Sequence, residues 1–178
     1  MTRRPTMIEP EPLLAPWLPA ATPEHIARIV RHALARVGVC EMPLGSNRST
    51  LIDEWAREAG APLASYWCAN FATKTWRAAG VPTAGRGLDP SCDALMAWAQ
   101  RTGRWSPTPS LGAITFYGTP ADATHVAVVV RLSPALLVVG GNERFGAIAS
   151  RNGVAVQLRP EERRDVLGYA LPLLEDAA

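Results

Sequence analysis

Apolar residues recur at helical spacing in the first half of the chain, whereas the second half holds short, uninterrupted apolar runs. The helical pattern is clearest in residues 22–38, where one apolar stripe is bounded by polar or turn-forming residues. Thr22 is expected to cap this helix, Pro23 suits its first position, and Gly38 suits its end. The same periodicity predicts three further helices, at about 50–59, 68–79 and 91–101.

Beyond Pro107 and Pro109 the spacing changes to runs rich in Val, Ile and Leu, separated by Gly, Pro and Asn. This pattern is typical of strands. The expected strands are 112–117, 125–132, 135–139, 154–158 and 166–170. Helices followed by strands indicate an α+β fold in which the N-terminal helices pack on a C-terminal antiparallel sheet.

Five prolines distributed over residues 1–21 predict an extended N-terminal arm, which leaves residues 22–178 as a single domain. Arg3 and Arg4 are not followed by a continuous apolar segment, so we expect neither a secretory signal nor a membrane span. A content of 48% hydrophobic and 19% charged residues favours a packed globular chain over disorder. We also expect a monomer.

The net charge of +2 comes from dispersed arginines, which argues against nucleic-acid binding. The three cysteines lie far apart, and their odd number predicts no disulfide framework. His25 and His32 fall opposite the apolar stripe of their helix, so both are expected to face solvent and to be poor catalytic candidates.

One cysteine, Cys68, stands where a helix is predicted to begin. Unpaired N–H groups and the helix dipole at that position favour a thiolate, the reactive form of cysteine. The alternative is a small buried hydrophobe, which is the commoner role of a single cysteine. Cys92 fits that alternative, and Cys40 has no feature that argues otherwise.

A nucleophilic thiol needs a nearby base, and His125 is the only histidine in the strand region. If strands 125–132 and 135–139 form a hairpin, Asn142 comes level with His125 and could orient its ring. A structural histidine at a strand end, and a turn at Gly-Gly-Asn, remain open as alternatives.

Short motifs in one order, from about residue 26 to 170, carry a family resemblance. They are Gly38-Val39-Cys40-Glu41, Gly45-Ser46-Asn47, Tyr66-Trp67-Cys68-Ala69-Asn70-Phe71, Ala79-Gly80-Val81-Pro82, Ser91-Cys92, Gly112-Ala113-Ile114-Thr115-Phe116-Tyr117, His125-Val126-Ala127-Val128-Val129, Gly140-Gly141-Asn142 and Leu167-Gly168-Tyr169. In this order they resemble the CHAP branch of the NlpC/P60 superfamily, in particular its phage-type cell-wall hydrolases. Departures are Tyr66, Ala113 and Gly140, where relatives carry proline, an acid and, in some cases, glutamate.

The resemblance implies a papain-like α+β fold with Cys68 as nucleophile, His125 as general base and then acid, and Asn142 as the residue that orients the histidine. Because Gly140 replaces the glutamate, Asn142 would act alone or share this task with Glu143.

Tyr66, Trp67, Glu143 and Asn47 are the expected residues of the oxyanion site and substrate groove. Trp67 could instead wedge between helix and sheet, and Asn47, like Glu41, could instead form a turn. No motif with metal-ligand spacing is present in the sequence, and no cofactor is expected.

These expectations lead to a cysteine-dependent amidase or endopeptidase that cleaves amide bonds of bacterial peptidoglycan. Two alternatives stay open: a wall-binding or phage structural module without turnover, and a thiol acyltransferase on the same fold. The implied setting is a phage lysin, a tail peptidase or an injected antibacterial toxin, made in the cytoplasm and delivered to the wall. An immunity protein or a delivery component would be its further partner.

Overall fold

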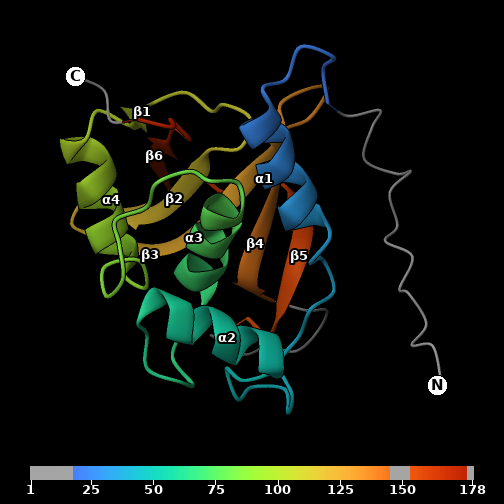
Figure 1. The fold of residues 1–178 in the computed structure, drawn as a ribbon, viewed down its shortest axis with the longest axis vertical. Helices are drawn as coiled ribbons and strands as arrows, with labels where there is room; N and C mark the ends of the chain where they lie inside the picture. The colour runs from blue at the N-terminus through green and yellow to red at the C-terminus, as the bar shows by residue number, and fades with distance from the viewer. Residues whose placement is uncertain (1–17, 145–152, 176–178) are drawn as a thin grey trace, which may run out of the picture.

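The computed structural model describes residues 18–144 and 153–175, which form four helices and a six-stranded antiparallel sheet (Figure 1). The helices are α1 (Glu24–Leu34), α2 (Thr50–Ala59), α3 (Cys68–Ala78) and α4 (Cys92–Arg101). The strands are β1 (Trp105–Ser106), β2 (Ile114–Thr119), β3 (Asp122–Arg131), β4 (Leu137–Glu143), β5 (Ala155–Pro160) and β6 (Val166–Ala170). The α+β prediction is therefore confirmed.

The sheet has the strand order β1-β6-β2-β3-β4-β5, with β3 and β4 joined as the expected hairpin. All five predicted strands are present, although their ends shift by up to four residues. The two-residue strand β1, at Trp105 and Ser106, was not predicted because it is too short to show a period.

Helix α2 begins at Thr50 and ends at Ala59, as predicted, and Gly60 follows it in the left-handed conformation. Helix α1 differs from its prediction because it ends at Leu34 and its N-cap is Pro23, which provides no side-chain cap. The hydroxyl of Thr22 donates to the carbonyl of Pro19 instead, so the expected Thr22 cap is wrong.

All four helices lie on one side of the sheet, with α3 in front of β3 and β4 and α2 packed on α3 (Figure 1). The principal core fills the space between these layers. Trp55, Trp76 and Trp98 belong to it, as their helical positions suggested. Strand β3 contributes Val126 and Val128 to this core, and its alternate residues Ala127 and Val129 belong to a smaller cluster on the other face of the sheet. Strand β3 is thus buried on both faces, which fixes the position of the side chains at its ends.

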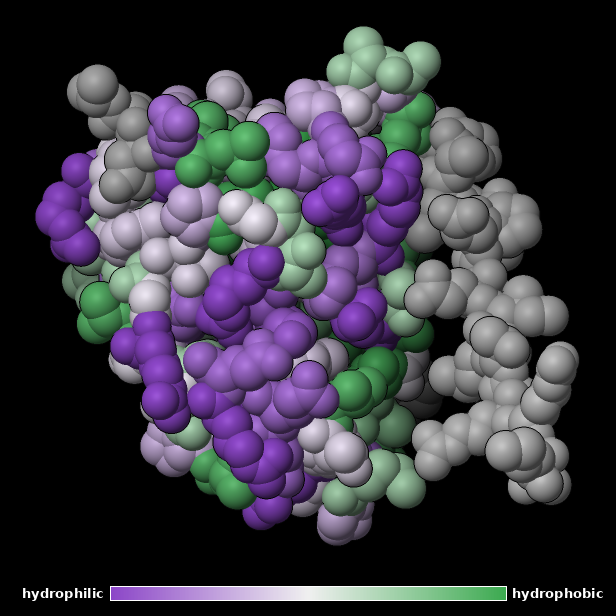
Figure 2. Space-filling model, viewed as in Figure 1, coloured by the Kyte–Doolittle hydropathy of each residue, from purple (hydrophilic) through white to green (hydrophobic). Residues whose placement is uncertain are grey.

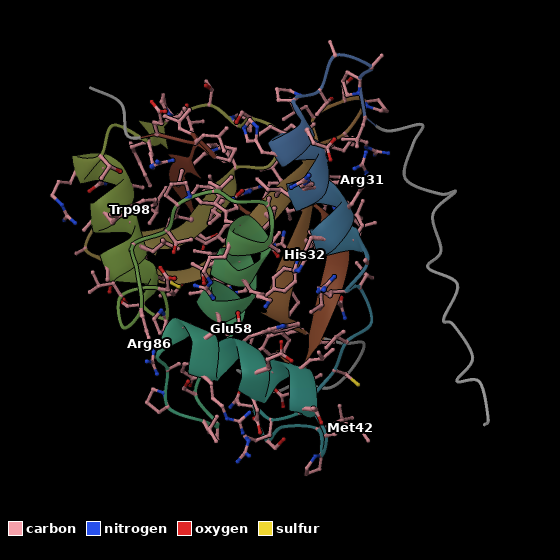
Figure 3. All side chains as sticks on the ribbon, viewed as in Figure 1. Arg31, His32, Met42, Glu58, Arg86 and Trp98 are labelled. Carbon is pink, nitrogen blue, oxygen red and sulfur yellow. The ribbon has the colours of Figure 1, made fainter. Side chains whose placement is uncertain are left out.

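The outer surface of α1 and α2 is largely hydrophilic (Figure 2). His32 of α1 is only partly exposed. Its Nδ1 lies 3.2 Å from the hydroxyl of Thr75 on α3, so the side chain is half-buried between α1 and α3 (Figure 3). Burial, together with Arg36 and Lys74, lowers the pKa of His32 to about 4. The expected solvent exposure of His32 is therefore wrong, and His25 is also only partly exposed.

Most of the expected proline-rich arm, residues 1–17, lies outside the described residues. Leu18 is described and packs against the principal core. Within residues 18–144 and 153–175, no helix has both the length and the apolar character that a membrane span needs.

Candidate active site

Cys68 is the first residue of α3, and the helix start around it has free hydrogen-bond donors. Trp67 is the N-cap and provides no side-chain cap, and the first helical bond runs from the N–H of Phe71 to the carbonyl of Trp67. The N–H groups of Cys68, Ala69 and Asn70 therefore have no partner within the helix. Together with the helix dipole, they favour negative charge beside the Cys68 sulfur.

His125 lies in β3 opposite Tyr117 of β2, and its side chain is mostly buried. Its Nε2 lies 3.0 Å from Oε1 of Glu143, at the end of β4. Burial disfavours the imidazolium, but hydrogen bonding to Cys68 and Glu143 outweighs burial and raises the pKa of His125 to about 9. With Nε2 bound to Glu143, Nδ1 is the ring nitrogen left to exchange a proton with Cys68.

The environment of Cys68 stabilises the thiolate. The hydrogen bond from Cys92 is the largest influence on the pKa of Cys68. Burial raises this pKa, but Cys92, His125 and the N–H of Val126 together lower it well below the ordinary value. The two sulfurs are 3.8 Å apart. The pKa of Cys92 is correspondingly raised, first by its bond to Cys68 and then by burial. Cys68 and His125 are therefore arranged as a thiolate–imidazolium pair.

The residue that holds His125 is Glu143 and not Asn142. The hairpin register pairs Val128 with Val139, and continued unchanged it would set Asn142 opposite His125, as expected from the sequence. However, the β4–β5 pairing is irregular between Gly140 and Glu143, and Asn142 has a positive φ of 57°. Such an irregularity redirects side chains. The Asn142 Oδ1 is buried without a hydrogen-bond partner among the described residues, so the assignment of Asn142 is corrected.

Two glycines make room for this arrangement. A side chain at Gly140 would overlap the carboxylate of Glu143, which occupies that space. A Cβ at Gly141 would lie 2.7 Å from the Cβ of Phe71 and 2.9 Å from the ring of Trp67. Gly140 thus admits the acid beside the histidine, and Gly141 lets β4 approach α3.

A ring of side chains encloses the base on the sheet. Nε of Arg159 donates to the same Oε1 of Glu143 at 3.0 Å, and its guanidinium lies 5.3 Å from the centre of the Tyr117 ring. Tyr117 in turn lies 5.6 Å from the His125 ring, and its hydroxyl donates to Glu161. Although burial favours the neutral acid, His125 and Arg159 lower the pKa of Glu143. The carboxylate is therefore held charged and in place.

These groups open into a cleft of about 790 Å³. It is lined by Tyr66, Cys68, Thr124, His125, Asn142, Glu143, Arg144, Gly153, Gln157, Arg159 and Arg163. The structure thus brings together five of the residues predicted from the sequence: Tyr66, Cys68, His125, Asn142 and Glu143. Tyr66 is 63% exposed, which leaves its ring available to a bound molecule.

Trp67 and Asn47 do not line this cleft. Trp67 is fully buried, packs against Trp55 at 6.0 Å, and donates from Nε1 to Glu41 at 3.0 Å. The wedge between helix and sheet is therefore its position, because its ring fills the space beside Gly141. Asn47 has a positive φ of 54°, as in a turn. The expectation that both residues line the groove is corrected.

Cys92, Arg159 and Tyr117 contact the site but were not predicted to do so. Cys92 carried a usable signal, because it is the first residue of α4 just as Cys68 is the first residue of α3. Arg159 and Tyr117 gave none, because their roles depend on the pairing of β4 with β5 and of β2 with β3.

No protein-family model, no curated protein and no solved structure matches the chain. In the described part of the chain, no group of three or more His, Cys, Asp or Glu side chains is placed to hold a metal ion. The geometry of the site is therefore the basis for assigning a function.

Proposed function

We propose that the protein is a cysteine-dependent hydrolase that cleaves amide bonds of bacterial peptidoglycan, with a papain-like fold of the NlpC/P60 (CHAP) type. The observation that carries the proposal is the set of Cys68, His125 and Glu143 on one cleft, with Cys68 at an uncapped helix start. An amide hydrolase with a thiol nucleophile needs these three roles. Peptidoglycan as the substrate rests on the ordered sequence motifs.

In the proposed reaction, the Cys68 thiolate attacks the carbonyl carbon of the amide. The free N–H groups at the start of α3 stabilise the oxyanion, and the His125 imidazolium donates its proton to the departing amine. His125, now neutral, removes a proton from water, which hydrolyses the thioester. Glu143 keeps the imidazole ring oriented and stabilises its charged form throughout.

The direct test incubates purified sacculi with the wild type and with Cys68→Ala, and measures newly released amino groups. We expect release by the wild type and none by the variant. Cys40→Ala is the matched control, because Cys40 does not line the cleft. Equal release by the wild type and Cys68→Ala would contradict the proposal.

The same samples distinguish the two alternatives. A wall-binding module would sediment with the sacculi and release nothing, whereas an acyltransferase would give products carrying an added amine when an amine acceptor is supplied. Mass spectra of the digested muropeptides also identify the bond, either the sugar-to-alanine amide or one within the stem peptide or cross-bridge.

The setting we propose is a phage lysin, a tail peptidase or an injected toxin that reaches the wall after delivery or lysis. A neighbouring gene for an immunity protein would support the toxin, and one for a holin would support the lysin.

A further inference from the structure

A second thiol lies beside the candidate nucleophile and forms no bond to the substrate in the proposed hydrolysis. Cys68 and Cys92 each begin a helix, and the two helix starts meet so that the sulfurs are 3.8 Å apart. A disulfide bond is about 2.05 Å long, so the sulfurs need to approach by about 1.8 Å. We propose that Cys68 and Cys92 are a redox-modification site, in which a hydroperoxide oxidises Cys68 and Cys92 then closes a reversible disulfide.

Cys68 is the thiol that reacts first. It lines the cleft, which gives a small peroxide access to its sulfur. Its thiolate is stabilised by Cys92, His125 and the N–H of Val126, and thiolates are the form that peroxides oxidise. The thiolate attacks the terminal peroxide oxygen, so that an S–O bond forms and the O–O bond breaks. The departing alkoxide or hydroxide takes the proton of the His125 imidazolium.

Cys92 is placed to resolve the sulfenic acid that results. In the resting state, its bond to the Cys68 sulfur is the main cause of its raised pKa. Oxidation makes Cys68 neutral, which removes that anion and lets Cys92 ionise more easily. The Cys92 proton passes to His125, its sulfur attacks Cys68, and hydroxide leaves with the proton as water. In total, two thiols and one peroxide give one disulfide, one alcohol or water, and one further water.

Cys40 supplies the internal control for this chemistry. It pairs through its backbone with Ala155, and in residues 18–144 and 153–175 the hydrogen bond between cysteine sulfurs joins Cys68 to Cys92 and does not involve Cys40. Closure of the Cys68–Cys92 bond would occupy the candidate nucleophile and would also protect it from irreversible oxidation. The device therefore predicts a loss of hydrolysis that a thiol reductant reverses.

The test treats the full chain with hydrogen peroxide at neutral pH, followed by thiol alkylation, intact mass measurement and non-reducing peptide mapping. In the wild type and in Cys40→Ser, we expect a loss of about 2 Da and a cross-linked peptide pair containing Cys68 and Cys92. Dithiothreitol should remove the link. In Cys92→Ser, we expect Cys68 to advance to sulfinic acid, which dithiothreitol does not reverse.

Oxidation of wild-type Cys68 to sulfinic acid without a Cys68–Cys92 link would overturn the inference, as would equal linkage to Cys40. Circular dichroism checks that Cys92→Ser is folded, and the wild-type map decides the question without that variant. Because the link is detected by mass, the inference stands or falls separately from the hydrolase activity.

Discussion

Helices α3 and α4 both begin with a cysteine, yet their first turns have opposite chemistry. The start of α4 is closed, since Ser91 accepts a hydrogen bond from the N–H of Ala94 and Asp93 accepts one from Ala123 of β3 at 2.7 Å. The start of α3 has Trp67 as its N-cap and no side-chain cap. One turn is tied to the sheet, and the other keeps its donors available.

The difference extends to the two thiols. The pKa of Cys68 is lowered, chiefly by the hydrogen bond from Cys92 and then by His125, whereas the pKa of Cys92 is raised by its bond to Cys68 and by burial. Position at the start of a helix is therefore not sufficient to lower the pKa of a cysteine. An absent side-chain cap and an imidazole distinguish the candidate nucleophile, Cys68, from Cys92, and Cys68 lines the cleft whereas Cys92 does not.

Replacing each of the two cysteines with alanine gives the largest expected difference in activity. Cys68→Ala should reduce hydrolysis at least about 1000-fold, since no other group on the cleft replaces the nucleophile. Cys92→Ala should stay within about tenfold of the wild type at pH 8. Initial rates on muropeptides measure both. A larger loss in Cys92→Ala than in Cys68→Ala would reverse the assignment of the two helix starts.

The next effect concerns the residue that orients His125 toward the α3 start. Glu143→Gln preserves the size of the side chain but removes the charge that stabilises the imidazolium, so kcat should fall roughly 100-fold. Asn142→Gly tolerates the positive φ and removes an amide whose Oδ1 has no hydrogen-bond partner among the described residues, so its rate should stay within about threefold. If Asn142→Gly were the more damaged variant, Asn142 and not Glu143 would be the orienting residue.

Substitutions at Gly140 and Gly141 should have different effects, one mainly on activity and the other mainly on stability. Gly140→Ala should displace the Glu143 carboxylate and lower kcat about tenfold with little change in the melting temperature. Gly141→Ala should press on Phe71 and Trp67 and cost about 1–3 kcal/mol of unfolding free energy. Steady-state rates and thermal unfolding of both variants check this. Equal behaviour of the two would show that Gly140 serves packing alone.

The sequence was sufficient to predict the four helices, five of the six strands, and the presence of Cys68 and His125 in one site. Gly60 and the apolar periodicity located α2, and position at a helix start selected Cys68 from three cysteines. These signals are local sequence preferences, which predict the structure correctly when the packing of the core favours the same conformation. The start of α1 was predicted less well, because the hydroxyl of Thr22 bonds to Pro19 and not to the first turn.

The third member of the site depended on information that is not local. Regular hairpin alternation favoured Asn142, but an irregularity against β5, a different partner strand, exchanged Asn142 for Glu143. Gly140 was the available signal, since it leaves the space that Glu143 fills. The position of Cys92 at the start of its own helix was a local signal, but its contact with Cys68 depends on how two helices meet on the sheet.

The pH dependence tests how much the α4 thiol supports the α3 thiolate. In the wild type, kcat/KM should fall above about pH 9, where His125 loses the proton that it donates to the leaving amine. Cys92→Ala removes the bond that most lowers the pKa of Cys68, so the acidic limb of the profile should move to higher pH. An acidic limb unchanged by Cys92→Ala would show that His125 and the helix start suffice.

The smallest effect is expected at the α4 cap itself. Ser91→Ala removes the acceptor for the Ala94 N–H, and loss of such a cap costs about 1 kcal/mol of unfolding free energy. The melting temperature should fall by about 2–4 °C for a chain of this size. Ser49→Ala on α2 is the matched control, since Ser49 caps Ile52 in the same way but belongs to a helix that packs on α3. Both variants should lose similar stability by thermal unfolding and retain the wild-type rate.

A rate loss confined to Ser91→Ala would mean that the start of α4 does more than anchor its helix. The physical reason would be a displacement of Cys92, whose sulfur lies 3.8 Å from that of Cys68.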